Sequence, residues 1–374
     1  MMIGLVGKPS SGKSSFFKAL TMLDVKIASY PFTTIDANKG VGYVKVECAC
    51  NQLTKRCNPR NSQCVDGIRF IPIKLLDVAG LVPGAHLGKG KGNKFLDDLR
   101  QADAFIHIVD MSGKTDENGL ETENHDPLSD IEWLKEEIEM WVYGIIQKTA
   151  AKKFDTDAIV KQLSGFSSKD EIIRNCAEDS GNNLKKLASL IIERTKPMLI
   201  AANKMDLPEA QENFDIISAK IHEGIIPCSA EMEIATRLAE NKGIIKLDPK
   251  SGKFAIIKEI NKQQESALQS IKEFTEKYGS TGVQKCLDKT VFDLLNCIEV
   301  YPVENENNWA DSKGNVLPDV YLVPKGTTAR EFASIVHTDF GKNFIAAVDA
   351  KTKMKVKEDY ELRKGDVIKI LAGK

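Results

Sequence analysis

The chain has 374 residues, which is long enough for two or three domains with separate cores. Its formal net charge of −1 excludes a strong overall basic field, so contact with nucleic acid would need a local patch. No apolar run approaches the roughly 20 residues of a membrane-spanning helix, and the first residues lead straight into a motif rather than a signal peptide. We expect a soluble, globular, cytoplasmic monomer with no membrane contact.

Four short apolar segments predict the parallel strands of one α/β sheet. They are MMIGLV, FIPIKLLDV, AFIHIVDMS and PMLIAANKMD, at 1–6, 70–78, 104–112 and 197–206. Helical patterns separate several of them, which indicates βαβ units and a doubly wound sheet.

The stretch 119–196 predicts a helical hairpin inserted between the third and fourth of these strands. The acidic loop TDENGLETENHDP leads into it, and Ser129 with Glu132 fits a capping box at the start of its first helix. A second helix is predicted near Asn183 to Arg194. The insertion is either a packing appendage or a lever that contacts a partner, and both readings stay open.

The C-terminal part predicts a small mixed β-sheet around one helix. Its strand-like segments are IEVYPV, DVYLVP, FIAAVDA and DVIKIL, and Thr328 with Glu331 fits a capping box for the helix TAREFASIV. The predicted division of the chain is a nucleotide domain at 1–118 and 197–232, the insertion at 119–196, a mostly helical connecting segment at 233–296 and the C-terminal domain at 297–374.

A phosphate-binding loop is predicted at residues 7–14. The sequence GKPSSGKS fits G-x-x-x-x-G-K-[ST] directly after a predicted strand. Glycines let backbone N–H groups turn inward as an anion nest, and the following helix adds its positive dipole end. We expect Lys13 to reach the β- and γ-phosphates and Ser14 to ligate Mg²⁺. The residues predicted to bind nucleotide here are Lys8, Pro9, Ser10, Ser11, Gly12, Lys13, Ser14 and Ser15.

Two further segments predict groups around the γ-phosphate and the metal ion. Asp77 ends an apolar strand and is expected to hold Mg²⁺ through a water molecule. Gly80 follows in DVAG and would present its N–H to the γ-phosphate. Thr33 or Thr34, in the loop YPFTT, could close over the metal, and a solvated turn threonine is the alternative for either.

The motif NKMD predicts recognition of guanine. Asp206 can accept hydrogen bonds from guanine N1–H and the N2 amino group, a pair that adenine lacks. Asn203 is expected to brace the phosphate loop, and the stem of Lys204 to cover the base. Ser229 and Ala230, after the apolar IIPC, are expected to supply a backbone contact to the ring. The order of these motifs predicts a guanine-nucleotide site.

Three segments carry a family resemblance. They are YPFTT, DVAGLVPGAHLGKGKGNKFLDDLRQAD and YLVPKGTTAREFASIVHTDFGKNFIAAVD. With them the chain resembles, over nearly its whole length, the Obg superfamily of translation-factor-class GTPases, and within it the YchF-related group in its archaeal form. The resemblance implies a P-loop NTPase domain with a helical insertion, a C-terminal β-grasp module called a TGS domain, and association with the ribosome or a translation complex. It also favours Thr34 as the threonine that closes over Mg²⁺.

The residue after DVAG is Leu81, where many GTPases carry the glutamine that positions water. YchF-related proteins have a hydrophobic residue there, so the resemblance implies that another group, a monovalent cation or a partner assists hydrolysis. His86 is the nearest candidate, and an exposed loop histidine is the alternative. Ser10 stands where many potassium-dependent relatives carry asparagine, and serine is the poorer cation ligand, which argues against dependence on K⁺.

The sequence therefore predicts a switch that binds GTP and hydrolyses it to GDP and phosphate with slow intrinsic turnover. Bacterial and eukaryotic relatives often alter the base-recognition motif and prefer ATP, whereas this chain keeps NKMD, so we expect GTP. The predicted catalytic set is Gly80, His86 and Thr34. The alternative, suggested by Leu81, is a nucleotide-gated binding adaptor with negligible hydrolysis.

One segment, ECACNQLTKRCNPRNSQC, concentrates half of the eight cysteines: Cys48, Cys50, Cys57 and Cys64. Without a secretory signal, such cysteines are reduced thiols or metal ligands rather than disulfides. Four thiolates could bind Zn²⁺ tetrahedrally and brace a loop next to the first switch segment. The spacing differs from the paired C-x-x-C of zinc ribbons, and unliganded cysteines are the alternative.

The segment KTKMKVK predicts a lysine stripe in the C-terminal domain. Lys351, Lys353, Lys355 and Lys357 would share one face of a strand and could meet RNA phosphates. An edge strand that lysines protect against aggregation is the equal alternative. Contact with RNA is therefore mainly what the family resemblance implies.

Overall fold

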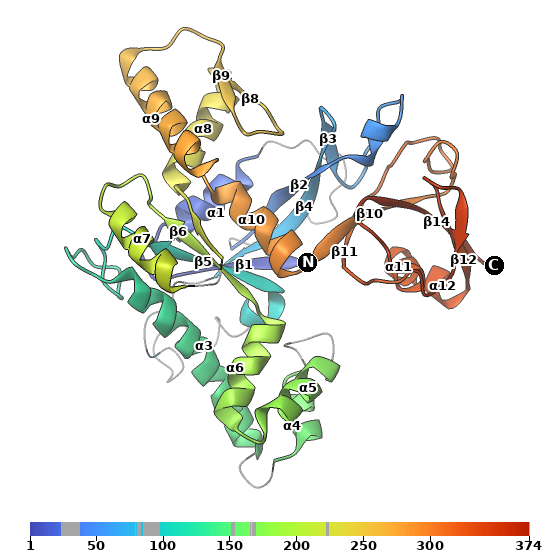
Figure 1. Cartoon of the computed structure of the whole chain (residues 1–374), viewed down its shortest axis with the longest axis horizontal. Helices are drawn as coiled ribbons and strands as arrows, with labels where there is room; N and C mark the ends of the chain where they lie inside the picture. Colours follow the sequence, from blue (N-terminus) through green and yellow to red (C-terminus); the bar gives the residue numbers. More distant parts are fainter. Residues whose placement is uncertain are drawn as a thin grey trace.

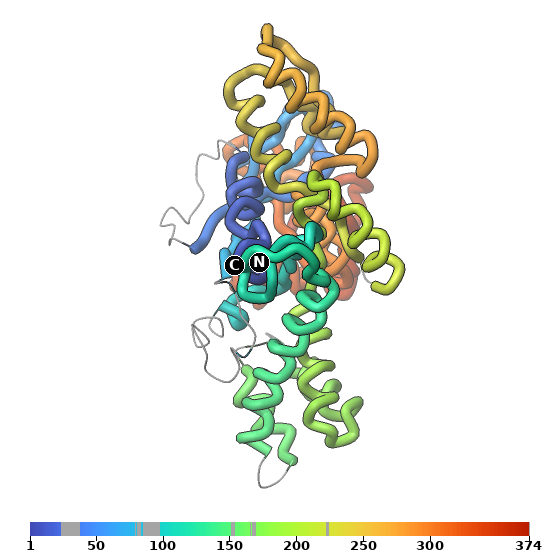
Figure 2. The backbone as a smooth tube through the Cα atoms, turned by 90° about the vertical axis from the view of Figure 1, so that its left-hand side faces the viewer, coloured from blue at the N-terminus to red at the C-terminus, as the bar shows by residue number. Residues whose placement is uncertain are grey.

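The computed structural model describes residues 1–23, 38–78, 80, 84, 98–150, 154–164, 166, 170–221 and 224–373. Two sheets dominate the described chain, and Figure 1 shows them side by side, the first near the centre and the second at the C-terminal end. Figure 2 shows the helices of 127–195, in green, at one end of the molecule and those of 230–278, in yellow to orange, at the opposite end.

The first sheet has seven strands in the order β2-β4-β1-β5-β6-β7, with β3 paired to β4. Five strands run parallel: β1 (Met2–Val6), β4 (Ile68–Asp77), β5 (Ala104–Asp110), β6 (Met198–Asn203) and β7 (Ile225–Pro227). Strands β2 (Lys39–Glu47) and β3 (Gln63–Val65) pair antiparallel with β4. The four predicted strands are confirmed. The phosphate loop, DVAG, NKMD and Ser229 with Ala230 lie at the carboxyl ends of β1, β4, β6 and β7, the edge of the sheet where doubly wound folds bind ligands.

The described residues of the insertion form four helices rather than the predicted hairpin. They are α3 (Pro127–Ala150), α4 (Thr156–Gln162), α5 (Asp170–Ser180) and α6 (Leu184–Thr195). The long helices α3 and α6 lie side by side, and one buried apolar cluster joins them to the sheet (Figure 1). Asn183 caps α6, as the predicted second helix requires.

The predicted capping box at Ser129 is wrong. Helix α3 begins at Pro127, three residues before a helix capped by Ser129 would begin, and Oδ1 of Asp126 accepts the N–H of Leu128 at 2.9 Å. Proline suits the first helical position because its fixed φ is already helical and its missing N–H would have had no partner there. The Ser129 hydroxyl instead donates to the Asp126 carbonyl oxygen at 2.7 Å.

Further helices flank the first sheet and lead towards the second. They are α1 (Lys13–Thr21), the short 3₁₀ helix η1 (Ala49–Gln52), α7 (Ala210–Lys220), α8 (Ala230–Asn241), α9 (Lys262–Tyr278), α10 (Val283–Lys289) and the π-helical turn η3 (Thr290–Leu294). A two-stranded ribbon, β8 (Ile245–Leu247) and β9 (Phe254–Ile256), packs near α8 and α9. The connecting segment is thus mostly helical.

The second sheet has five strands in the order β11-β10-β14-β12-β13. They are β10 (Cys297–Val303), β11 (Tyr321–Pro324), β12 (Phe344–Asp349), β13 (Met354–Val356) and β14 (Asp366–Ala372). Helix α11 (Ala329–Val336) covers one face through Phe332, with the short α12 (Thr338–Lys342) after it. The predicted capping box of Thr328 and Glu331 is confirmed.

The predicted lysine stripe is broken. Residues 351–353 form a turn, in which Lys353 has φ 61°, and β13 comprises only Met354–Val356. The Nζ of Lys353 bonds to the carbonyl oxygen of Glu306. The lysines therefore do not form one strand face, and β13 is an edge strand of the sheet. Among the described residues, no helix combines the length and apolar character needed to cross a membrane.

A partly buried carboxyl group on α10 predicts a pH-dependent stability. Asp288 accepts the backbone N–H of Lys45 at 3.2 Å and Nε2 of Gln284 at 2.9 Å. Burial raises the pKa of Asp288 to about 6 in spite of these hydrogen bonds. Because the folded pKa lies above the ordinary value, the group's stabilising contribution is complete below about pH 4 and is lost as the pH rises through 6.

Asp288→Asn is therefore expected to raise the free energy of unfolding at pH 7.5 by up to about 3 kcal/mol, with little change near pH 4. Urea unfolding at the two pH values measures the difference. Asp293→Asn is the control, since Asp293 pairs with Lys289 at the surface and should show no such dependence. An Asp288→Asn effect of equal size at both pH values would contradict the assignment.

Candidate nucleotide-binding site

The phosphate loop joins β1 to α1 with a backbone that few residues tolerate. Ser10 and Gly12 have φ values of 61° and 90°, and Gly12 caps α1 in the left-handed region. A Cβ atom at Gly12 would also collide with Nδ2 of Asn203. Glycine is therefore required at this position both for its conformation and for the close approach of the NKMD motif.

Asn203 links the phosphate loop to the start of α8. Its Nδ2 donates to the carbonyl oxygen of Ser11 at 3.0 Å, and its Oδ1 accepts the N–H of Ala230 at 3.1 Å. The brace expected of Asn203 is thus present. The side chain of Ser229 caps α8 by accepting the N–H of Met232 at 3.1 Å. With the Ala230 N–H bonded to Asn203, the guanine contact expected of Ser229 and Ala230 stays a prediction.

Lys204 is held by an aspartate that the sequence analysis missed. Its Nζ lies 2.8 Å from Oδ2 of Asp110, which is fully buried at the end of β5. Burial raises the pKa of Asp110, but hydrogen bonds from Lys204, Ser112 and Thr115 outweigh burial and leave the pKa below its ordinary value. The carboxylate is therefore charged at neutral pH and fixes the lysine stem beside the pocket. The position of Asp110 at the carboxyl end of a predicted parallel strand is the feature of the sequence that could have identified it.

Lys13 and Asp77 meet directly at the ends of neighbouring elements. The Nζ of Lys13 lies 2.5 Å from Oδ1 of Asp77, the last residue of β4. Ser14, in the first turn of α1, is exposed on the same pocket. Hydroxyl and carboxylate oxygens suit Mg²⁺, so the chemistry of these donors fits the predicted ion.

The predicted nucleotide residues surround one pocket of 650 Å³. It brings together the phosphate loop, the glycine of DVAG, the NKMD motif and the start of α8, although these lie in four separate parts of the sequence. Its lining is Lys8, Pro9, Ser10, Gly12, Lys13, Ser14, Ser15, Gly80, Asn203, Lys204, Asp206, Leu207, Ala230 and Glu231. Asp206 is exposed there and able to meet a base, whereas Ser11 and Ser229 are fully buried beside it.

The side chain of Lys8 binds α3 and the acidic loop. It is buried, with Nζ 2.7 Å from Oδ2 of Asp130 in α3, and it donates to the Thr115 carbonyl oxygen at 2.6 Å. The Ser10 hydroxyl donates to the carbonyl oxygen of Gly119 at 3.0 Å in the same acidic loop. Contacts from Lys8 to a nucleotide would therefore come from its backbone, and the phosphate loop is tied to the insertion.

Several predicted residues lie outside the described part of the chain. They are Thr33, Thr34, Leu81 and His86. The assignments of Thr34 to Mg²⁺ and of His86 to water positioning therefore stay predictions.

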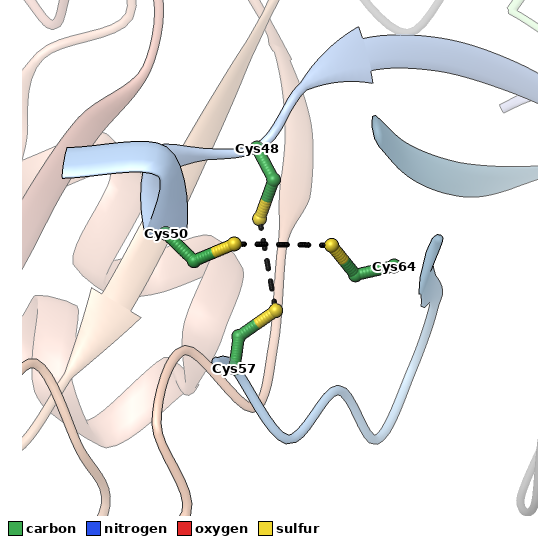
Figure 3. A group of neighbouring side chains, drawn as sticks. All are labelled: Cys48, Cys50, Cys57 and Cys64. Atoms are coloured by element: carbon green, nitrogen blue, oxygen red, sulfur yellow. Dashed lines mark hydrogen bonds between the residues drawn. The ribbon is translucent and has the colours of Figure 1, made fainter. Parts of the chain in front are cut away.

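The four cysteines of 48–64 come together, away from the nucleotide pocket. Their sulfur atoms all lie within 4.8 Å of one another (Figure 3). The sequence left a four-thiolate site and unliganded cysteines both open, and the structure brings the four sulfur atoms together.

Three family models match the chain. One, described as Obg-like GTPase YGR210-like, G4 motif-containing domain, matches residues 201–305. A model for 50S ribosome-binding GTPases matches residues 2–143, and a TGS domain model matches residues 313–372. The last match covers most of the second sheet.

Relatives match over nearly the full length. A GTP-binding protein of Methanocaldococcus jannaschii is 50% identical, with 99% of each chain covered. The ribosome-binding ATPase YchF of Bacillus subtilis is 28% identical, covering 98% of this chain and 97% of that protein. The crystal structure of a GTP binding protein from Pyrococcus horikoshii OT3 is 37% identical, with a TM-score of 0.76 and both chains fully covered.

The YchF GTPase of Schizosaccharomyces pombe shares the fold, with a TM-score of 0.58 at 18% identity over 99% of this chain and 97% of that one. The chain belongs to the YchF-related group of the Obg-like GTPases and carries the TGS domain of that group.

Proposed function

We propose that this protein binds GTP, hydrolyses it slowly and acts as a switch on the ribosome or a translation complex. The observation that carries the proposal is the single pocket that gathers the phosphate loop, Gly80 and NKMD. The name of the B. subtilis relative, a ribosome-binding ATPase, supports the ribosome as partner. Because this chain keeps Asp206, whose carboxylate matches the guanine edge, GTP is the proposed nucleotide rather than ATP.

Mg²⁺ would be held by Ser14, Thr34 and Asp77, the last through water, and would neutralise charge on the β- and γ-phosphates. The contact between Lys13 and Asp77 supports this placement, because it brings a phosphate-binding cation and a metal-binding carboxylate to the same wall. Gly80 would donate its N–H to the γ-phosphate. Hydrolysis then relies on positioning and electrostatics, with Leu81 in place of glutamine.

We assign the GTPase domain to 1–118 and 197–232, the insertion to 119–196, the connecting segment to 233–296 and the TGS domain to 297–374. The contact of Lys8 with Asp130 supports a role of the insertion in sensing the phosphate loop. RNA contact through the TGS domain, a monomeric state and a cytoplasmic location belong to the same proposal. Dependence on K⁺ is not part of the proposal, because the Ser10 hydroxyl already donates a hydrogen bond to the carbonyl oxygen of Gly119.

Steady-state GTP hydrolysis with and without purified cognate ribosomes tests the proposal. We expect ribosomes to raise turnover at least tenfold over the slow intrinsic rate, since they would complete a site without its glutamine. Asp206→Asn is expected to weaken GTP binding by about 10- to 100-fold and to favour xanthosine triphosphate, whose C2 oxygen accepts from the new amide.

Turnover that stays at background with intact GTP binding would instead favour the nucleotide-gated adaptor. His86→Ala, measured alongside, distinguishes a water-positioning histidine from an exposed loop histidine without a catalytic role. Loss of ribosome stimulation with unchanged GTP affinity would assign water positioning to His86. If Asp206→Asn binds GTP as tightly as the original chain, the assignment of the base site is wrong.

A further inference from the structure

The cysteine cluster has the geometry of a tetrathiolate metal site. The Sγ atoms of Cys48 and Cys57 are 3.8 Å apart, and so are those of Cys50 and Cys64. Figure 3 shows the two pairs crossing, so that the sulfur atoms surround a common centre. Four sulfur atoms about 2.3 Å from a tetrahedral zinc ion are separated by about 3.8 Å along each edge, whereas a disulfide needs about 2.05 Å. The observed separations fit the metal site.

A buried positive charge lies beside this cluster. Arg69 on β4 is opposite Cys64 on β3 in the antiparallel pairing, and its side chain is fully buried. Its Nη2 donates to the carbonyl oxygen of Leu317 at 2.6 Å, while Nε and Nη1 have no hydrogen-bond partner among the described residues. A buried cation without a carboxylate partner is costly. Zn²⁺ with four thiolates carries a net charge of about −2 and supplies the missing negative partner.

The loop between the last two cysteines contacts the TGS domain. Within it, Asn58 and Arg60 donate their backbone N–H groups to the carbonyl oxygens of Val316 and Pro318 at 2.8 and 2.7 Å. Asn61 accepts the N–H of Val320 at 3.1 Å and donates to its carbonyl oxygen at 2.9 Å.

An ion pair and apolar packing complete this joint. Arg60 pairs with Asp319, and Cys48 and Ala49 share a buried apolar cluster with Val316 and Leu317. Most of residues 51–60 are exposed, however, so little apolar burial holds the loop in shape. A second constraint is needed to hold the row of hydrogen bonds between residues 58–61 and 316–320, the polar ladder, in register.

We propose that Cys48, Cys50, Cys57 and Cys64 bind one structural Zn²⁺ ion, and that this ion fixes the joint between the GTPase domain and the TGS domain. Cys57 and Cys64 bracket the ladder to 316–320, so binding both thiolates to one ion fixes the ends of the loop that carries it. Metal binding contributes directly to the folding of such small sites. The ion thereby keeps the TGS domain in a defined place relative to the nucleotide pocket. The proposal does not depend on GTP hydrolysis.

Metal analysis of the full chain purified with zinc tests the site. We expect about one zinc ion per chain, as for a four-cysteine structural site, and at least a tenfold loss of bound zinc in Cys57→Ser and in Cys64→Ser. Cys176→Ser is the matched control, because Cys176 is buried in α5 and lies outside the cluster. It should retain the full amount. A chain that fails to retain zinc, or that retains iron instead, overturns the assignment of the ion.

Hydrogen exchange tests the joint and remains informative if the serine variants fold poorly, because zinc can be removed from the unaltered chain with a chelator. The amides of Asn58, Arg60 and Val320 should exchange at least tenfold faster without zinc, while that of Ile106 in β5 should not change and so reports an intact sheet. Restored zinc should restore protection. Bound zinc with unchanged exchange at all three amides overturns the role in the joint.

Discussion

Asn203→Ala is expected to weaken GTP binding about 100-fold and to lower the free energy of unfolding by about 3 kcal/mol. The side chain satisfies two backbone groups at once, the carbonyl oxygen of Ser11 and the N–H of Ala230, and is itself 2% exposed. Truncation leaves both groups buried without a partner, at about 1–3 kcal/mol each. It also frees the phosphate loop from α8, so the loop must be ordered again when nucleotide binds. Calorimetric titration and urea unfolding measure the two effects.

Asn213→Ala provides the comparison. Asn213 also donates its Nδ2 to a backbone carbonyl oxygen, that of Met111 at 2.8 Å, but it does not touch the phosphate loop. We expect a loss of about 1 kcal/mol in stability from this variant, with GTP affinity within twofold of the original. If Asn203→Ala binds GTP within threefold of the original chain, the brace does not organise the loop.

The strands and motifs that build the pocket were predictable because each is local. A buried parallel strand appears as a short apolar run with the functional residue at its end, as Asp77 ends β4 and Asn203 ends β6. Asp110 ends β5 in the same way, paired in register with Asn203. A single aspartate belongs to no recognisable motif, so the sequence did not indicate its function. Its role depends on Lys204, which lies far along the chain and comes near only through the pairing of β5 with β6.

The errors arose where one local pattern could fit two structures. Ser129 and Glu132 have capping-box spacing, yet Asp126 before Pro127 starts the helix earlier and satisfies its first donors. Alternate lysines suggested a strand at 351–357, but the left-handed backbone of Lys353 places the first of them in a turn. The cysteine spacing left metal binding open, because whether four sulfur atoms meet depends on how β3 returns along β4.

Lys8→Met is expected to lower the free energy of unfolding by about 3–5 kcal/mol. The ion pair of Lys8 with Asp130 has both side chains only 2% exposed, so the substitution leaves a carboxylate buried without its cation. His125 Nε2, 2.8 Å from Oδ1 of Asp130, offsets part of that loss. Urea unfolding measures the change. Lys289→Met, which breaks an exposed pair with Asp293, should change stability by no more than about 0.5 kcal/mol.

The double variant Lys8→Met with Asp130→Leu separates the ion pair from the lysine's other contact. Removing both charges eliminates the unpaired carboxylate, so the double variant should be more stable than Lys8→Met alone, with a coupling energy of about 2 kcal/mol or more. The hydrogen bond from Lys8 to Thr115 stays lost in both, and a residual deficit of about 1 kcal/mol would measure it. Because Lys8 lies within the phosphate loop and Asp130 within α3, the coupling energy is also the strength of the tie between pocket and insertion. A coupling energy near zero would mean that the insertion packs beside the loop without sensing its state.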